Sequence, residues 1–272
     1  MNANRGTIGI FDSGVGGLSV LRALRAELPR HEIVYLADQA RVPYGPRPLE
    51  EVRGFAVANA RFLLARGARP VVVACNAASA AALHHLREIH PEELFVGMEP
   101  AVKPAAERTH SGVVGVLATP ATFQGKLYAS VVERFAEGGV VLEDTCPGLV
   151  QRIEEGDLDG PRTRAILERA LRPMLARKID VVVLGCTHYP FVVPLVREIC
   201  GPGVRVIDPA PAVARQAARF AGAPPADDRA GAATLFTTGD AAALAALAPR
   251  LLGTLGEHCA VRHVDPPLPE PA

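Results

Sequence analysis

The feature that most constrains the fold is an alternation of short apolar runs with segments of helical periodicity. In the first part of the chain, the runs that predict buried strands are residues 7–11, 33–37 and 70–74. Apolar residues at helical spacing follow these runs, over residues 18–28, 49–66 and 77–89. Strands that alternate with helices predict a parallel sheet covered by helices, which is an α/β fold.

The alternation restarts after Ser111. It predicts a strand at 113–117, helices at about 123–137 and 161–178, and a strand at 181–184. After Asp208, an Ala-rich helix, a strand near 235–237 and a further helix are expected, and the Pro-rich end, 264–272, should be a loose tail. We therefore predict a second α/β unit.

The two halves also resemble each other. Ile8-Gly9-Ile10-Phe11 matches Val114-Gly115-Val116-Leu117, and the Val-rich strand before Cys75 matches the one before Cys186. Val-rich strands are common in parallel sheets, so the strands alone would be weak evidence of a repeat. A cysteine that follows the corresponding strand in each half makes the repeat more specific.

The chain has five cysteines, at positions 75, 146, 186, 200 and 259, which is an odd number without the spacing of a disulfide framework. Free thiols are therefore expected. Cys75 stands where a strand passes into a helix, and a helix N-terminus can lower the pKa of a thiol from about 8.5 toward neutrality. Cys186 repeats the arrangement, whereas the other three are predicted to be packing residues. The alternative for each is an ordinary buried cysteine.

A glycine-rich turn follows the first strand, in the order Asp12-Ser13-Gly14-Val15-Gly16-Gly17. Open α/β sheets bind ligands at this end of their strands. One alternative is a dinucleotide turn with Asp38 as the ribose ligand. Against it, Ser19 stands at the third glycine position, and the Asp12 carboxylate would repel a pyrophosphate. Asp38 could also be an ordinary loop carboxylate.

Composition excludes other classes of function. Lys and Arg number 29 against 29 Asp and Glu, so no nucleic-acid partner is indicated. No apolar run approaches the roughly 20 residues of a membrane-spanning helix, so a cytoplasmic protein is expected. Cys186 and His188 could begin a metal site, but further ligands at a recognisable spacing are lacking, and no metal is expected.

Four segments, in this order, resemble the bacterial glutamate racemases: Ile-Phe-Asp-Ser-Gly-Val-Gly-Gly, Arg41-x-Pro43-Tyr44-Gly45, Ala-Cys-Asn-x-Ala-Ser-Ala and Gly-Cys-Thr-His-Tyr-Pro. The resemblance runs from Ile8 to about Asp208. It implies two doubly wound parallel-sheet domains related by pseudo-symmetry, with the active site at their interface. The first domain would comprise residues 1–98 plus 208–272, and the second residues 99–207.

The resemblance also implies an activity. Cys75 and Cys186 would transfer protons at the two faces of Cα, interconverting L- and D-glutamate to supply D-glutamate for peptidoglycan. Asp12 and His188 would assist them. Glu154 would be a further assisting carboxylate, with its neighbour Glu155 as the alternative. Substrate contacts would come from Asp12, Ser13, Tyr44, Gly45, Asn76, Ala77, Thr187 and His188. No cofactor is expected, since a pyridoxal mechanism needs a Schiff-base lysine and Lys103, Lys126 and Lys178 lie outside the motifs.

The family is usually homodimeric, so a homodimer is expected. An aspartate racemase with the same chemistry and a binding protein that has lost turnover are the alternatives. The chain departs from the family pattern at Ala77, where a hydroxyl residue, Thr or Ser, normally follows Cys75-Asn76.

Overall fold

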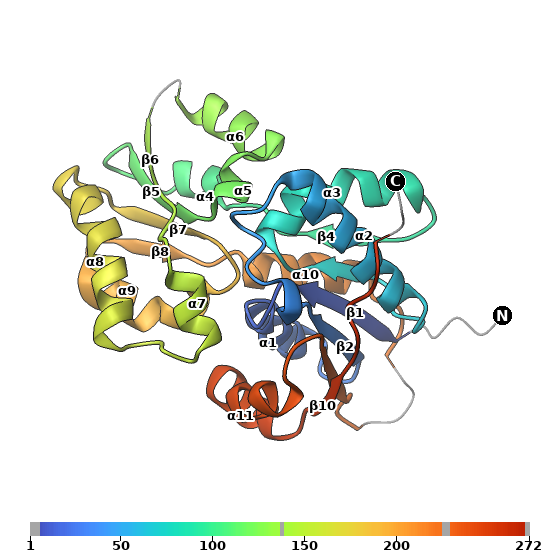
Figure 1. Ribbon diagram of the computed structural model, residues 1–272. Helices are drawn as coiled ribbons and strands as arrows, with labels where there is room; N and C mark the ends of the chain where they lie inside the picture. The colour runs from blue at the N-terminus through green and yellow to red at the C-terminus, as the bar shows by residue number, and fades with distance from the viewer. Residues whose placement is uncertain (1–5, 137–138, 225–228, 270–272) are drawn as a thin grey trace.

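The first sheet gathers strands from both ends of the chain. The computed structural model describes residues 6–136, 139–224 and 229–269, and Figure 1 shows the arrangement of its elements. The strand order is β10-β9-β2-β1-β3-β4, and every neighbouring pair is parallel. The bounds are β1 (Thr7–Asp12), β2 (Glu32–Ala37), β3 (Val71–Val73), β4 (Phe95–Gly97), β9 (Ala233–Thr237) and β10 (Ala260–His263).

The second sheet has the order β6-β5-β7-β8 and is also parallel throughout. Its strands are β5 (Val113–Ala118), β6 (Val140–Asp144), β7 (Val181–Gly185) and β8 (Arg205–Ile207). All residues of the central strands β1, β3 and β7 are buried, which is why these strands are continuous apolar runs in the sequence. The predicted α/β class with two parallel sheets is confirmed.

The two sheets share one strand order. Within the first sheet β2-β1-β3-β4 are adjacent in that order, and β6-β5-β7-β8 repeat it in the second. In the first sheet, β2 lies on one side of β1 and β3 on the other. In the second sheet, β6 and β7 lie in the same way on the two sides of β5, so the strand order reverses beside β1 and beside β5. Ligands bind in parallel sheets at the carboxyl ends of the strands beside such a reversal. Asp12 and Cys75 lie at this end of the first sheet, and Cys186 at the equivalent end of the second.

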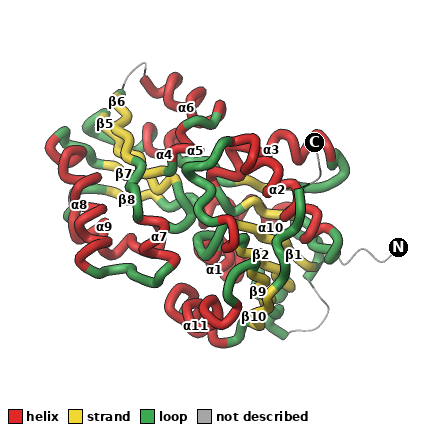
Figure 2. The backbone as a smooth tube through the Cα atoms, viewed as in Figure 1, coloured by secondary structure: helices red, strands yellow, loops and turns green. Residues whose placement is uncertain are grey.

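Helices separate the strands and cover the sheets (Figure 2). They are α1 (Leu18–Glu27), α2 (Leu49–Leu64), α3 (Asn76–Ile89), α4 (Val102–Ala106), α5 (Pro120–Phe123), α6 (Lys126–Ala136), α7 (Leu149–Glu154), α8 (Pro161–Ala176), α9 (Val193–Cys200), α10 (Ala210–Phe220), α11 (Ala241–Leu252) and α12 (Thr254–Glu257), with short 3-10 helices η1 (Gln39–Arg41) and η2 (Tyr189–Val192).

One predicted helix is wrong in its extent. The segment predicted as a single helix over 123–137 contains the end of α5 and then α6, with a break at Gly125. Gly125 lies against α3, where an added Cβ would be 2.9 Å from the Cβ of Ala80. Residue 137 lies outside the described residues.

The chain returns to the first sheet after β8. Helix α10 packs along α1, and β9 and β10 then extend the sheet beside β2. The end of the chain is less loose than predicted, since the Val264 N–H donates to the Thr237 carbonyl and Arg41 donates to the Pro267 carbonyl. Residues 270–272 lie outside the described part of the chain.

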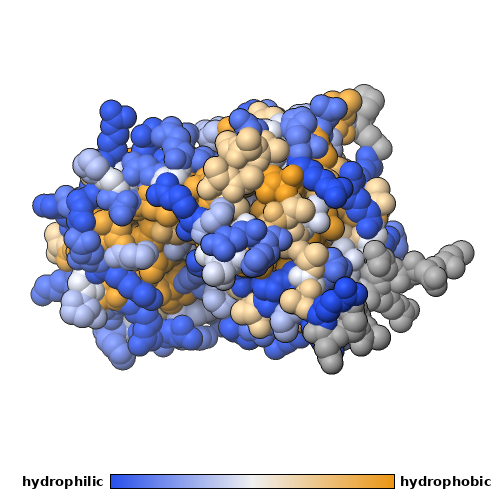
Figure 3. Space-filling view, turned by 90° about the horizontal axis from the view of Figure 1, so that it is seen from below, coloured by the Kyte–Doolittle hydropathy of each residue, from blue (hydrophilic) through white to orange (hydrophobic). Residues whose placement is uncertain are grey.

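One face of the molecule is mostly hydrophilic, with smaller apolar areas between the polar side chains (Figure 3). Among the helices of the described residues, none has the length and apolar character needed to cross a bilayer.

Candidate active site

A small cavity lies where the carboxyl ends of the two sheets meet. Its volume is about 20 Å³, and both Cys75 and Cys186 line it. Of the other predicted site residues, those that line it are Ser13, Tyr44, Gly45, Asn76, Ala77, Thr187 and His188. Because this volume holds little more than one water molecule, an organic substrate can enter only if the surrounding elements move apart.

Cys75 joins the first sheet to α3. It follows the buried strand β3 and takes the N-cap position of α3 with an extended backbone, and only 5% of the residue is exposed. Burial, followed by the Asp12 carboxylate, raises the pKa of Cys75 well above its ordinary value, although backbone N–H groups of Ala78 and Ser13 oppose the shift. The expected lowering by the helix N-terminus is therefore wrong, because desolvation of a thiolate outweighs it.

Cys186 follows β7 and is also buried. The Nδ1 atom of His188 lies 3.7 Å from its Sγ atom, within hydrogen-bonding range for sulfur. His188 can therefore donate to a thiolate at Cys186 or orient a thiol there. Each cysteine thus has a different partner: a carboxylate near Cys75 and an imidazole beside Cys186.

Asp12 ends β1 and is fully buried. One of its carboxylate oxygens accepts the Gly14 N–H at 3.1 Å, and the other accepts the Thr187 hydroxyl at 3.2 Å. Burial raises the pKa of Asp12, while the nearby His188 opposes the shift. Asp12 therefore lies behind the cavity wall and links the first sheet to the residue that follows Cys186.

His188 and Glu154 form a buried pair. The His188 Nε2 atom lies 2.6 Å from Glu154 Oε1, and that oxygen also accepts the Val15 N–H at 2.7 Å. Burial alone would lower the pKa of His188, but its hydrogen bonds to Cys186 and Glu154 raise it well above its ordinary value. Burial alone would raise the pKa of Glu154, but hydrogen bonds, first that from His188, lower it. Both shifts favour the charged forms, an imidazolium and a carboxylate.

The choice between two neighbouring glutamates follows from their contacts. The carboxylate of Glu154 faces the site, whereas Glu155 is exposed and pairs with Arg152 at 2.6 Å. Glu154 is the last residue of α7, and the helix directs its side chain toward the glycine-rich turn. The geometry favours Glu154.

The glycine-rich turn accommodates the residues that approach it from the second sheet. An added Cβ at Gly14 would lie 2.7 Å from the carboxyl carbon of Glu154. At Gly16 it would meet the His188 ring and would lie 2.7 Å from the Thr187 hydroxyl oxygen. The Glu154 carboxylate thus occupies the position before α1 where a dinucleotide-binding protein would hold the pyrophosphate. The dinucleotide interpretation is wrong.

Asp38 is neither a ribose ligand nor an ordinary loop carboxylate. It is fully buried, and its carboxylate accepts hydrogen bonds from Arg41, Tyr44, Asn59 and Thr238. The Tyr44 hydroxyl donates to Asp38, so Tyr44 borders the cavity while its hydroxyl is held by a neighbour. This network fixes the segment that carries Gly45.

Asn76 differs from its neighbours because its amide has no partner. Both the Nδ2 and Oδ1 atoms are buried and lack a hydrogen bond. A buried amide without partners is uncommon in proteins and points to a ligand at this position. Ala77, beside it, is buried, and its side chain offers no polar atom to the cavity.

Sequence reasoning missed Thr119, which also lines the cavity. It directly follows β5, the counterpart of β1, so the repeat that placed Asp12 and Ser13 could have found it. Its side chain lies against Gly45, where an added Cβ would be 2.6 Å from the Cβ of Thr119.

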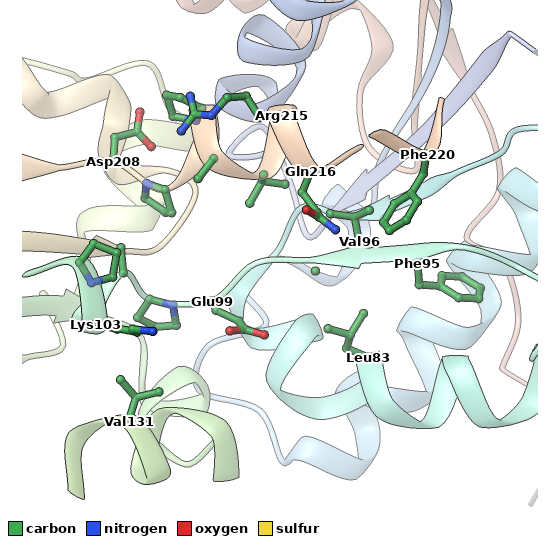
Figure 4. A pocket seen from close by; sticks show the side chains of 18 of the residues that line it. Leu83, Phe95, Val96, Glu99, Lys103, Val131, Asp208, Arg215, Gln216 and Phe220 are labelled. Atoms are coloured by element: carbon green, nitrogen blue, oxygen red, sulfur yellow. The ribbon is translucent and has the colours of Figure 1, made fainter. Parts of the chain in front are cut away.

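A larger cavity of about 1020 Å³ lies elsewhere, between α10 and the segment that connects β4 to α4. Figure 4 shows Asp208 and Arg215 on one side of it and Glu99 and Lys103 on the other. It contains none of the predicted site residues. In the described part of the chain, no group of three or more His, Cys, Asp or Glu side chains is placed to hold a metal ion.

Known proteins resemble this chain over most of its length. The family model described as Asp/Glu/Hydantoin racemase matches residues 18–217. The glutamate racemase of Roseiflexus sp. (strain RS-1) is 53% identical over 253 residues, which cover 90% of this chain and 91% of that protein.

Solved structures of glutamate racemases are also similar to this chain. Glutamate racemase isoform RacE1 from Bacillus anthracis superposes with a TM-score of 0.83 at 31% identity, covering 97% of this chain and 98% of that one. The Escherichia coli glutamate racemase, solved with L-glutamate and the activator UDP-MurNAc-ala, gives a TM-score of 0.82 at 33% identity, covering 96% and 98%. The chain belongs to the Asp/Glu/Hydantoin racemase family and, within it, to the glutamate racemases.

Proposed function

We propose that this chain interconverts L- and D-glutamate without a cofactor, using Cys75 and Cys186 as the proton-transfer groups. The observation that carries the proposal is that the two thiols, each at the end of a corresponding strand, line one small cavity. Glutamate is the substrate named for the relatives that cover nearly the whole chain.

Racemisation needs a base on one face of Cα and an acid on the other. The sulfur that acts as thiolate takes the Cα proton, breaking the C–H bond and forming an S–H bond. The other thiol gives its proton to the opposite face, breaking its S–H bond and forming the new C–H bond. The two sulfurs have then exchanged protonation states, so the same pair serves the reverse reaction.

Asp12 and His188 would assist the cysteine nearest to each. The imidazolium of His188 can donate to the Cys186 sulfur, and Glu154 fixes the orientation of the ring. Asp12, whose pKa is raised by burial, interacts electrostatically with Cys75 and can exchange a proton in that part of the site. Asn76, Thr187 and backbone N–H groups near Ser13 and Gly45 would bind the substrate carboxylates.

The chain would close around its substrate. The division we propose, residues 1–98 plus 208–272 against 99–207, assigns each sheet to one domain and places the cavity between them. Closure would exclude water and strengthen the electrostatic interactions in the site. We further propose, from the family alone, a cytoplasmic homodimer that supplies D-glutamate for peptidoglycan.

One assay tests the activity. The purified chain, without added cofactor, is incubated separately with L- and D-glutamate and with L- and D-aspartate, and the products are separated by chiral chromatography. We expect either glutamate enantiomer to approach an equal mixture, with aspartate much slower. Racemisation of aspartate at the higher rate would overturn the substrate assignment, and racemisation of neither would overturn the function.

A further inference from the structure

Gln39 lies next to the site but belongs to none of the motifs. It follows β2 at the start of η1, on the side of the first sheet. Its Nε2 atom donates to the Oε2 atom of Glu154 at 2.9 Å, while the other oxygen of Glu154 accepts from Val15 and from His188. Every donor to the Glu154 carboxylate except His188 therefore comes from elements of the first sheet.

The amide of Gln39 can point in only one direction. The Gly239 N–H donates to the Thr237 hydroxyl oxygen at 2.9 Å, and the hydroxyl in turn donates to Gln39 Oε1 at 2.7 Å. A flipped amide would place its NH2 group against the Thr237 hydroxyl and its oxygen against the Glu154 carboxylate, two acceptors facing each other. Thr237 is fully buried, so water cannot replace its bond.

These contacts form one chain of hydrogen bonds. It runs from the Gly239 N–H through Thr237, Gln39, Glu154 and His188 to the sulfur of Cys186. It begins in the returning C-terminal segment and ends at one of the two thiols. No comparable chain reaches Cys75 among the contacts of the described residues.

We propose that Gln39, oriented by Thr237, is a positioning residue that holds Glu154, and through it His188, in the geometry needed for proton transfer at Cys186. The inference rests on the proposed function. Gln39 touches neither the cavity nor a sulfur, so it acts only through Glu154. Because Gln39 and Glu154 come from opposite sides of the cavity, the contact forms when the two sides close.

The charges around the His188 ring make its position sensitive. Glu154 faces it from α7, Cys186 from the end of β7 and Asp12 from the end of β1. Without the Gln39 bond, Glu154 keeps its bonds to Val15 and His188 but loses the donor that fixes its second oxygen. The carboxylate can then rotate, and His188 moves relative to Cys186.

The test compares Gln39→Leu with the wild-type chain, using glutamate that carries hydrogen or deuterium at Cα, in both directions. Because the two enantiomers are equally stable, kcat/KM must fall equally in both directions, and we expect a loss of roughly 10- to 100-fold, the range for a hydrogen bond to a charged group. The isotope effect on kcat/KM is compared with the wild-type value for the same direction. It should increase in the direction in which Cys186 takes the Cα proton and decrease in the other direction, where Cys186 returns a solvent proton.

Three further variants separate positioning from general damage. Thr237→Val should change the isotope effects in the same two opposite directions with a smaller loss of kcat/KM, and Thr237→Ser should recover most of that loss. Thr234→Val, which removes a half-buried hydroxyl from the same strand, should behave like the wild-type chain. Thermal unfolding of each variant reports whether it is folded.

The results distinguish the inference from the function. If the wild-type chain racemises glutamate and Gln39→Leu keeps the wild-type isotope effects in both directions, Gln39 is not a positioning residue for Cys186. If the folded Thr237→Val and Thr237→Ser variants lose activity alike, the hydroxyl does not orient Gln39. If the wild-type chain shows no racemisation, the proposed function fails and this inference fails with it.

Discussion

At the scale of single residues, the two thiols face the cavity in unlike surroundings. Cys75 is held at the start of α3 near a buried carboxylate, which favours its neutral thiol. Cys186 has the imidazole of His188 beside its sulfur, and the raised pKa of that ring favours its cationic form. The reaction is symmetric and the strand order is repeated, but the groups that assist each thiol differ. Substitutions near one cysteine should therefore affect the two reaction directions unequally in kcat and in isotope effects.

Removal of either thiol should stop the reaction. Because each face of Cα has one proton-transfer group, we expect Cys75→Ala and Cys186→Ala each to reduce kcat/KM by at least about 10²- to 10⁴-fold, the usual contribution of a general acid or base. Chiral assay of the purified variants measures this. Cys200→Ala, at the end of α9 and outside the cavity, is the control and should retain activity. Near-normal turnover by either cavity variant would reject the two-base scheme.

Ala77 predicts a weakened substrate contact. It lines the cavity beside Asn76, at the position where the family resemblance leads us to expect a hydroxyl. A hydrogen bond contributes about 0.5–1.5 kcal/mol, so Ala77→Thr should lower KM for glutamate by roughly tenfold or less, with a smaller change in kcat. Steady-state kinetics in both directions measure the change. An unchanged or higher KM would mean that the pocket is built around alanine.

At the scale of elements, the glycine-rich turn after β1 is shaped by what packs on it. Gly16→Ala would place a methyl group against the His188 ring and the Thr187 hydroxyl. We expect kcat to fall by about 10²-fold, since a displacement of about 1 Å in a catalytic group has that effect. Gly54→Ala is the matched control, because its nearest neighbour within reach is a Pro269 carbon 3.5 Å away. Equal kinetics for the two variants would contradict this account of the turn.

The strands that the sequence predicts most directly are those buried on both faces. The central strands β1, β3, β5 and β7 each contain a run of apolar residues, so their positions follow from hydropathy. The edge strands β4, β6, β8 and β10 were not predicted. β4 and β8 have three residues each, and β6 and β10 are partly or largely exposed, so none of them has the apolar run of a central strand.

The candidate site could be predicted only in part for a similar reason. The thiols, Asp12 and His188 end buried strands or follow them closely, and the motifs that surround them are visible in one sequence. Gln39 and the roles of Gly14 and Gly16 depend on contacts between the two sheets. Such contacts join residues more than 100 positions apart, as in the bond between Val15 and Glu154, and no local pattern encodes them.

At the scale of the whole molecule, the two sheets meet through polar contacts at the site. Glu154 bonds to Val15 and Gln39, and Thr187 bonds to Asp12. Because the cavity between them is smaller than an amino acid, we expect the molecule to open for substrate exchange. Opening would break these hydrogen bonds, so the catalytic residues reach their arrangement only when the molecule closes.

The buried pair of His188 and Glu154 predicts a pH-dependent stability. The pKa of His188 is raised in the folded chain, so above its ordinary value of about 6.5 the folded state keeps a proton that the unfolded state releases. This contribution is fully present below about pH 6.5 and is lost as pH rises through the raised value. The free energy of unfolding in urea should therefore fall from pH 6.5 upward, and less steeply in His188→Gln. Equal slopes would show that His188 is not held as a cation.

The measurement that tests the central claim most directly follows the hydrogen at Cα. L-glutamate with protium at Cα is converted by the wild-type chain in D2O, and the D-glutamate and the remaining L-glutamate are separated early in the reaction. Two thiols on opposite faces predict deuterium at Cα of nearly all the product, because the returning proton comes from a sulfur that exchanges with solvent, and little deuterium in the remaining substrate. Product that keeps the protium of its substrate would contradict proton transfer by two separate thiols.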